Sequence, residues 1–354
     1  MAGDTLAETG TQSNPSVAEP HPGRRVAVAL AGALTLMLTF VALFLAAFHD
    51  PEPNRVPVAV VGSLDAARQL QVRVARAGPG SINAIAVATP DDARSAVLRQ
   101  RVQAALVMDP EHPRLIVASA AGTTEMAALK DLVGRAAGPG AAPLVVEDVR
   151  PLPRGDSKGL SPVFVAFGVT LASLGSGIVL SVFGRRLRYG LLLTALLGLG
   201  VVAGLLIAVL ADPLIGALTG AFWPLAGLIA LLVVAVAAPM CGLGRLAGPH
   251  GLVLGVFVML LLAVSSGGGP LGFYMLPEFF RAISQWLPTG TAMTAIRRAV
   301  YFDGERTLHS VVVLAVWAAG GLLAVAVGRL RIHRVPIGPS RHSSERNLPL
   351  GLSS

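Results

Sequence analysis

The chain has few charged residues and almost no lysine or cysteine. Asp, Glu, Lys and Arg make up 14% of its 354 residues, whereas 53% are hydrophobic. A typical soluble domain carries about 25% charged residues, so this composition argues against a soluble protein and favours a chain largely surrounded by lipid. The single cysteine, Cys241, excludes an intrachain disulfide and any metal cluster built from several cysteines.

Sequence signatures of catalysis and metal binding are also missing. HExxH and CxxC stretches do not occur, which excludes the usual zinc-protease and thiol-redox sites. A G-x-x-x-x-G-K-[ST] stretch does not occur either, so any ATP hydrolysis would come from a partner. We therefore expect a protein that is not an enzyme and that holds no cofactor or metal.

Long apolar runs, by contrast, are abundant. A membrane-spanning helix needs about 20 apolar residues, and the first run is longer than the apolar core of a signal peptide, so we interpret it as a retained anchor. We predict six transmembrane helices, at 26–48, 162–183, 189–211, 222–240, 250–266 and 309–328. No Asp, Glu, Lys or Arg lies in the middle of a span, which argues against a proton-driven carrier.

The arginines give the orientation. Cytoplasmic segments are rich in Lys and Arg, and this bias is met when both termini are cytoplasmic, with a disordered tail at 1–25 and a basic tail at 329–354. The arginines that then face the cytoplasm are Arg24, Arg25, Arg185, Arg186, Arg188, Arg245, Arg329, Arg331, Arg334, Arg341 and Arg346. Because these residues flank apolar runs, the net charge of +8 indicates topology and not nucleic-acid binding. Heavy Ala, Gly, Val and Arg usage with two lysines indicates a bacterial plasma-membrane protein.

A soluble-looking segment, 49–161, separates the first span from the others. β-Branched runs alternate with amphipathic stretches that begin at helix-capping residues. The predicted strands are 56–61, 82–88, 105–108, 114–119 and 144–149, and the predicted helices are 64–77, 89–103 and 123–137. The sequence thus predicts a polytopic α-helical membrane protein with an extracytoplasmic α/β or α+β domain between helices 1 and 2.

A second extracytoplasmic segment, 267–308, precedes the last span. Over 276–287 we expect one helical face to carry Phe and Trp and the opposite face to be polar, which is typical of a helix in the membrane interface. Pro288 ends this helix, and a second short helix is expected at 291–302. The segment forms either an outer gate or a structural re-entrant hairpin. The candidate gate residues are Glu278, Arg281, Trp286, Pro288, Arg297, Arg298 and Tyr301.

Two glycine pairs invite close helix packing. Gly200 and Gly204, like Gly216 and Gly220, have the spacing that lets helix backbones approach one another. Ordinary glycine use in membrane helices is the alternative interpretation.

Three stretches carry a family resemblance. They are the strand entry 50–62, the helix-to-strand passage 93–113, and the segment from Leu276-Pro-Glu-Phe to Arg297-Arg-x-x-Tyr-Phe-x-Gly304. With one anchor span, an external domain and five clustered spans, the chain resembles the ABC-2-type permease superfamily in its branch with a long first external loop. The nearest likeness is to the YhgE/Pip-like (phage infection protein-like) and DUF3533-like membrane proteins.

The resemblance implies a homodimeric or paired permease that exports a hydrophobic or amphipathic substrate and is driven by a separate cytoplasmic P-loop ATPase. In that account Arg185, Arg186 and Arg188 face the ATPase. The alternative is a non-transporting membrane scaffold, or secretion or envelope accessory protein, whose external domain binds a partner. The short connection 184–188 favours the scaffold, and the five-helix block disfavours it.

Overall fold

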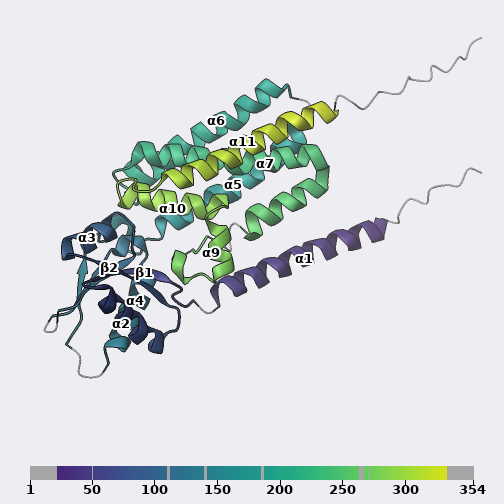
Figure 1. Ribbon diagram of the computed structural model, residues 1–354. Helices are drawn as coiled ribbons and strands as arrows, with labels where there is room; N and C mark the ends of the chain where they lie inside the picture. The colour runs from purple at the N-terminus through teal and green to yellow at the C-terminus, as the bar shows by residue number, and fades with distance from the viewer. Residues whose placement is uncertain are drawn as a thin grey trace, which may run out of the picture. The chain divides into compact units, whose positions relative to one another are not determined.

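The computed structural model describes residues 22–49, 51–109, 112–138, 142–184, 187–262, 267–269 and 271–332. The chain divides into two compact units, Met1–Ala42 and Leu43–Ser354. Among the described residues, five helices are long and apolar enough to cross a membrane: Leu30–Phe48, Ser161–Phe183, Tyr189–Leu214, Phe222–Leu260 and Leu308–Arg329. The protein is thus mostly helical with several candidate spans, as its composition predicts (Figure 1).

The described part of the first unit belongs to helix α1 (Pro22–Phe48), which begins at Pro22 and not at the predicted residue 26. Its large apolar side chains, including Leu30, Leu38 and Val41, are exposed. A helix that is apolar all round suits a lipid environment. The rest of the predicted tail 1–25 lies outside the described residues.

Residues 56–148 form five strands and three α-helices in the predicted order. The elements are β1 (Val56–Val61), α2 (Leu64–Ala77), β2 (Ile82–Val87), α3 (Pro90–Leu98), β3 (Ala104–Val107), β4 (Arg114–Val117), the 3-10 turn η1 (Ser119–Ala121), α4 (Thr123–Ala137) and β5 (Val145–Asp148). Ser63 and Thr89 cap α2 and α3 by accepting hydrogen bonds from backbone N–H groups three residues ahead. Strong caps explain why the sequence predicts these helix starts well.

The strands make one mixed sheet in the order β2-β1-β3-β4-β5. β1 pairs in parallel with β2 and β3, β3 pairs antiparallel with β4, and β4 pairs in parallel with β5. Val58 and Val60 pack with Leu70 of α2 and Leu129 of α4 in one buried cluster. Ala59, between the two valines, belongs to a second cluster that contains residues of α3 and continues into the long apolar helices. The two faces of the sheet are therefore covered differently.

The other long helices form a bundle around α7. Its elements are α5 (Ser161–Phe183), α6 (Tyr189–Val209), the π-turn η4 (Leu210–Leu214), α7 (Phe222–Val256), the π-turn η5 (Phe257–Leu262) and α11 (Leu308–Ile332). α5, α6 and α11 all pack on α7, which is the most buried of the candidate spans. Beyond Ile332, the predicted tail 329–354 lies outside the described residues.

α7 reverses direction at Gly248, whose φ of 57° and ψ of −137° are not helical. Beyond it, Gly251 lies against the Leu243 carbonyl and Gly255 against the Met240 sulfur, so the two arms run antiparallel. The predicted spans 222–240 and 250–266 fall on these arms, and residues 263–266 lie outside the described residues.

The prediction of close helix packing is confirmed for Gly200 and Gly204 but not for Gly216 and Gly220. A Cβ on Gly200 would lie 2.8 Å from the Ala230 carbonyl oxygen, and a Cβ on Gly204 would overlap the Ala226 carbonyl. These two glycines therefore allow close contact between α6 and α7. Gly216 and Gly220 instead have φ values of 73° and 91° in the turn before α7, because Pro213 lies in the π-turn that ends α6. The prediction of helix packing was wrong for this pair.

The segment before α11 contains the 3-10 turn η6 (Phe273–Met275), α9 (Glu278–Ser284) and α10 (Pro288–Tyr301). The expected apolar face over 276–287 is split, because Phe280 packs with Leu276 and Ala47 while Phe279 and Trp286 are exposed. The prediction of one apolar face was wrong, since α9 ends at Ser284 and its buried side follows Phe280. α9 ends at Ser284, before Pro288, and Pro288 instead starts α10 three residues earlier than predicted, since proline suits the first helical position.

Candidate functional site

The helix α10 joins the bundle to the α/β domain. It packs against α5, α7 and α11 on one side and against η1 on the other, and Figure 1 shows it at the end of the bundle nearest the sheet. Most of its side chains are buried, and the Thr289 hydroxyl lies 3.0 Å from that of Thr170 on α5. α10 is thus held by the bundle, and its polar residues contact the α/β domain.

Adjacent arginines on α10 attach it to backbone carbonyls. Arg297 Nη1 donates to the Ala121 carbonyl oxygen in η1 over 3.0 Å. Arg298 Nη1 donates to the Arg306 carbonyl oxygen over 2.9 Å, and Arg306 Nη1 donates to the Gln100 carbonyl oxygen over 3.1 Å. These hydrogen bonds link α10 and the turn before α11 to the α/β domain.

Tyr301, at the end of α10, donates its hydroxyl to the carboxylate of buried Asp156. The same carboxylate accepts the backbone N–H groups of Leu160 (3.1 Å) and Ser161 (3.1 and 3.2 Å) at the start of α5. Burial and this hydrogen bond raise the pKa of Tyr301 above its usual range, so the phenol stays protonated and keeps donating. Asp156 therefore joins α10 to the start of α5.

Glu278 and Arg281 on α9 contact the segment that leads into β1. Glu278 forms an exposed ion pair with Arg55 at 3.4 Å. The Arg281 guanidinium donates to the backbone carbonyl of Asn54 and, over 3.3 Å, to its side-chain oxygen. Its central carbon also lies 5.8 Å from the centre of the Tyr274 ring, a cation–π distance.

Trp286 contacts the start of the last long helix. Its carbonyl oxygen accepts the Trp317 indole N–H over 2.7 Å, and its ring meets His309 edge to face with centroids 5.5 Å apart. The Trp286 side chain is otherwise exposed. An exposed tryptophan beside an apolar bundle fits the headgroup level of a membrane.

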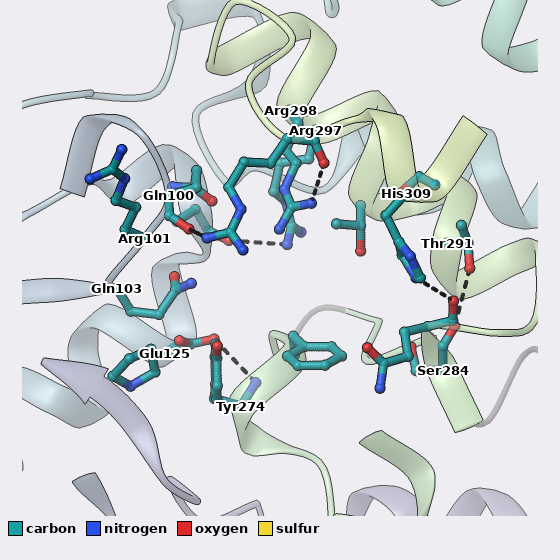
Figure 2. A pocket seen from close by; sticks show the side chains of 17 residues that line it. Gln100, Arg101, Gln103, Glu125, Tyr274, Ser284, Thr291, Arg297, Arg298 and His309 are labelled. Atoms are coloured by element: carbon teal, nitrogen blue, oxygen red, sulfur yellow. Dashed lines mark hydrogen bonds between the residues drawn. The ribbon is translucent and has the colours of Figure 1, made fainter. Parts of the chain in front are cut away.

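A cavity of about 360 Å³ lies at this junction. Figure 2 shows polar side chains around it from both sides, with Gln100, Gln103 and Glu125 from the α/β domain and Arg297, Arg298 and His309 from the helical segment, while the Arg101 side chain lies at the edge of this group. Its lining is Pro57, Gln100, Arg101, Gln103, Ala121, Glu125, Phe273, Tyr274, Ser284, Gln285, Thr291, Thr294, Arg297, Arg298, Arg306, His309 and Ser310.

Positive charge predominates around the cavity. Arg101, Arg297, Arg298 and Arg306 line it, and within the described ranges none of them has a carboxylate within 4.0 Å. The one carboxyl in the lining, Glu125, is only 2% exposed, and its Oε2 accepts the Tyr274 backbone N–H over 3.5 Å. Four arginines thus line the cavity, Arg101 at its edge, against a single buried acid.

Burial raises the pKa of Glu125 to about 7, although the Tyr274 N–H, Arg297 and Arg281 each lower it. Burial likewise lowers the pKa of Arg297 and of Arg298. Glu125 is therefore divided between its neutral and charged forms near neutral pH, and the cavity carries excess positive charge in either form.

Four side-chain atoms in this lining have hydrogen-bonding capacity left over. Gln100 Nε2, Arg297 Nε, Arg298 Nε and Glu125 Oε1 are buried and find no partner among the described residues. Buried polar groups usually have partners, and three of these four atoms are donors. A group that would complete these hydrogen bonds must therefore be mainly a hydrogen-bond acceptor.

The structure brings most of the predicted gate residues to this junction, but in different roles. Arg297 and Arg298 line the cavity, whereas Glu278, Arg281 and Tyr301 hold neighbouring segments together. Pro288 starts α10, and the Trp286 side chain is exposed. Of the three arginines predicted to face an ATPase, Arg188 is exposed just before α6, and Arg185 and Arg186 lie outside the described residues.

Sequence reasoning missed the contribution of the α/β domain to the cavity. Gln100 and Arg101 follow α3, and Glu125 lies in the first turn of α4, where an acid is typical of a helix start. No local pattern separates these residues from ordinary surface positions. The φ of 54° at Gln100, rare for a residue with a side chain, has no signal in the sequence.

The stretch Gly155-Asp-Ser-Lys-Gly159 matches the letters of the hydrolase motif G-x-S-x-G. That motif works where a sharp turn joins a strand directly to a helix, but here it spans the 3-10 turn η2 (Arg154–Asp156) and the residues before α5. Ser157 is exposed, and Asp156 is occupied by the start of α5 and by Tyr301. This context does not support a catalytic serine.

Within the described part of the chain, no three His, Cys, Asp or Glu residues are placed to hold a metal ion. A scan against protein-family models found no match, and searches of curated proteins and of solved structures found none either.

Proposed function

We propose that the protein is a bacterial plasma-membrane permease subunit of ABC-2-like architecture that exports a hydrophobic or amphipathic substrate with a separate ATPase. In this proposal the chain crosses the membrane six times, the arms of α7 on either side of Gly248 being the fourth and fifth crossings. Both termini are cytoplasmic, the α/β domain is extracytoplasmic, and α9 and α10 form the outer mouth.

The observation that carries the proposal is the position of α10. Anchoring an external domain takes one apolar helix, and α1 already provides it. Here a further bundle is packed around α7, and the buried helix α10 ties its end to the α/β domain. An arrangement that couples an external domain to several membrane helices fits a pathway whose outer end opens and closes.

A second feature supports an apolar or amphipathic substrate. A cleft of about 420 Å³ lies between the last turn of α1 and α5, and it is lined by Phe44, Phe48, Val163, Phe164, Phe167, Gly269 and Leu271. Together with the polar cavity, it offers an apolar and a charged surface beside the segment 267–308.

The second candidate function is a non-transporting scaffold whose external domain binds a partner. It is favoured by the connection between α5 and α6, which spans only residues 184–188 and leaves no room for a helix that contacts an ATPase. In this candidate the junction only fixes the orientation of the α/β domain.

The test is purification of the tagged protein from its native membrane in mild detergent, followed by mass spectrometry. A stoichiometric P-loop ATPase that is lost on changing Arg185, Arg186 and Arg188 to alanine supports the permease. The matched control is Arg99→Ala, on the exposed surface of the α/β domain, which should retain the ATPase. An envelope or secretion protein bound in place of any ATPase would overturn the permease and favour the scaffold.

A further inference from the structure

We propose that the cavity between the α/β domain and α10 is a binding site for a phosphate group, carried either by a phospholipid headgroup or by a soluble phosphate. The proposal goes beyond transport, because such a site has the same chemistry in a permease and in a scaffold. Its test measures binding, so its outcome is independent of whether an ATPase is found.

The arginines that line the cavity carry positive charge that no nearby carboxylate balances. Each of Arg297, Arg298 and Arg306 uses one N–H for a backbone carbonyl and has no carboxylate within ion-pair distance among the described residues. Guanidinium groups that converge without anions attract an anionic ligand, and they match the oxygens of phosphate well. Near neutral pH an inorganic phosphate carries up to two negative charges and a lipid phosphodiester carries one. Either can therefore compensate part of the positive charge of these arginines.

Several buried hydrogen-bond donors of the lining have no partner within the described chain. Gln100 is nine-tenths buried, its Nε2 finds no partner in the described ranges, and Figure 2 shows its side chain beside those of the arginines at the cavity. The Nε atoms of Arg297 and Arg298 are in the same situation. Side chains with donors to spare thus come from both the α/β domain and α10, and they line the same cavity, as a ligand with several acceptor oxygens requires.

Glu125 is the one acid in the lining. Its Oε1 has no partner among the described residues, while Oε2 accepts the Tyr274 N–H. A protonated Glu125 donates a hydrogen bond to a phosphate oxygen, whereas an ionised one repels it. The high pKa that burial gives this carboxyl, about 7, makes the donating form available at neutral pH.

The position of the cavity also gives a lipid headgroup access. His309 and Ser310 lie in the first turn of the apolar helix α11, and the exposed Trp286 ring contacts His309. Aromatic residues of this kind mark the headgroup level of a bilayer, which is where phosphate groups of lipids are found.

The test uses the purified full chain and two probes. Inorganic phosphate is titrated into protein in a neutral detergent by calorimetry, and the protein is reconstituted in nanodiscs of phosphatidylcholine alone or with phosphatidylglycerol, with bound lipid measured by native mass spectrometry. The diagnostic variant is Arg101→Gln, because Arg101 is exposed and its side chain makes no hydrogen bond or ion pair with any described residue, while its backbone N–H, which bonds the Ala96 carbonyl, is kept by the substitution. The matched control is Arg99→Gln, which removes the same charge two residues away and outside the lining.

We expect R101Q to weaken phosphate or phosphatidylglycerol binding about 3- to 10-fold and Gln100→Met to weaken it to a similar extent, with R99Q unchanged. Saturable binding of inorganic phosphate identifies a soluble ligand, and retention of phosphatidylglycerol alone identifies a lipid headgroup. Absence of both, or equal losses in R101Q and R99Q, would overturn the proposal. Because R101Q removes no intramolecular contact, its unfolding temperature should equal that of the parent, which separates lost binding from lost folding.

Discussion

The interface between α7 and α11 and the junction between α10 and the α/β domain are held together in opposite ways. Gly321 of α11 lies so close to Pro239 of α7 that a Cβ would overlap the proline ring. At the junction, by contrast, arginines reach carbonyls across a cavity and leave polar atoms without partners. At Gly321 the first interface depends on close backbone contact, whereas the second depends on directional hydrogen bonds and leaves hydrogen-bonding groups unused.

The largest expected effect comes from filling the tight interface. Gly321→Leu should destabilise the protein by about 3 kcal/mol or more, because the new side chain meets the α7 backbone, which cannot move aside. The measurement is thermal unfolding and gel filtration in detergent. Gly320→Leu is the matched control, since a Cβ there meets nothing within 4 Å. Similar behaviour of the two variants would contradict the close packing.

The junction should show a pH dependence that the tight interface lacks. Because the Glu125 pKa rises from 4.5 to about 7 on folding, the folded state binds more protons in this range, and stability should fall as pH rises from about 4.5 to 7. The total is about 3 kcal/mol. Arg297 on α10, Arg281 on α9 and Tyr274 in η6 face this carboxyl.

The measurement compares unfolding temperatures of the parent and Glu125→Gln at pH 5 and pH 8. Between pH 5 and pH 8 the unfolding temperature of the parent should fall by several degrees more than that of the variant. All other groups are common to both proteins, so their contributions cancel in the difference. Parallel curves would show that Glu125 does not titrate in this window.

A smaller effect is expected where the junction meets α5. Asp156→Ala should cost about 2 kcal/mol, because it leaves the N–H groups at the start of α5 and the Tyr301 hydroxyl without their acceptor. Tyr301→Phe should cost about 1 kcal/mol, because it removes one of these bonds. Asp303→Ala, at an exposed ion pair with Arg150, is the control for loss of an acid. Equal losses at 156 and 303 would contradict the capping role of Asp156.

The smallest effect is expected at Glu278. Its ion pair with Arg55 is exposed on both sides, and such pairs contribute about 0–1 kcal/mol. Glu278→Gln should therefore shift the unfolding temperature by less than one degree and lose even that shift in high salt. A large shift would make this contact a structural part of the junction.

The sequence predicted the local features of this protein better than the long-range ones. The starts of α2 and α3 follow from the capping residues Ser63 and Thr89, and the bounds of β1 follow from its β-branched run. Both signals act within a few residues. Pro213 and Pro249 mark the breaks before Gly216 and at Gly248 locally, but the antiparallel packing of the two arms of α7 depends on contacts between residues that are farther apart. Arg297 and Arg298 were predicted as candidates because they lie in the outer segment. Arg306, whose carbonyl accepts from Arg298, lies in the same segment, but Ala121, whose carbonyl accepts from Arg297, comes from the α/β domain.

In the proposed topology the α/β domain and the α5–α6 connection lie on opposite sides of the membrane, and the position of the cavity follows from this. Cys241 is the only cysteine and is buried, so Cys241→Ala gives a background for single-cysteine labelling in intact cells. A membrane-impermeant maleimide should label Asp91→Cys, on the exposed surface of α3, and should label Arg188→Cys only after the cells are opened. Labelling of Arg188→Cys in intact cells, with Asp91→Cys protected, would contradict the proposed topology and the outer position of the cavity.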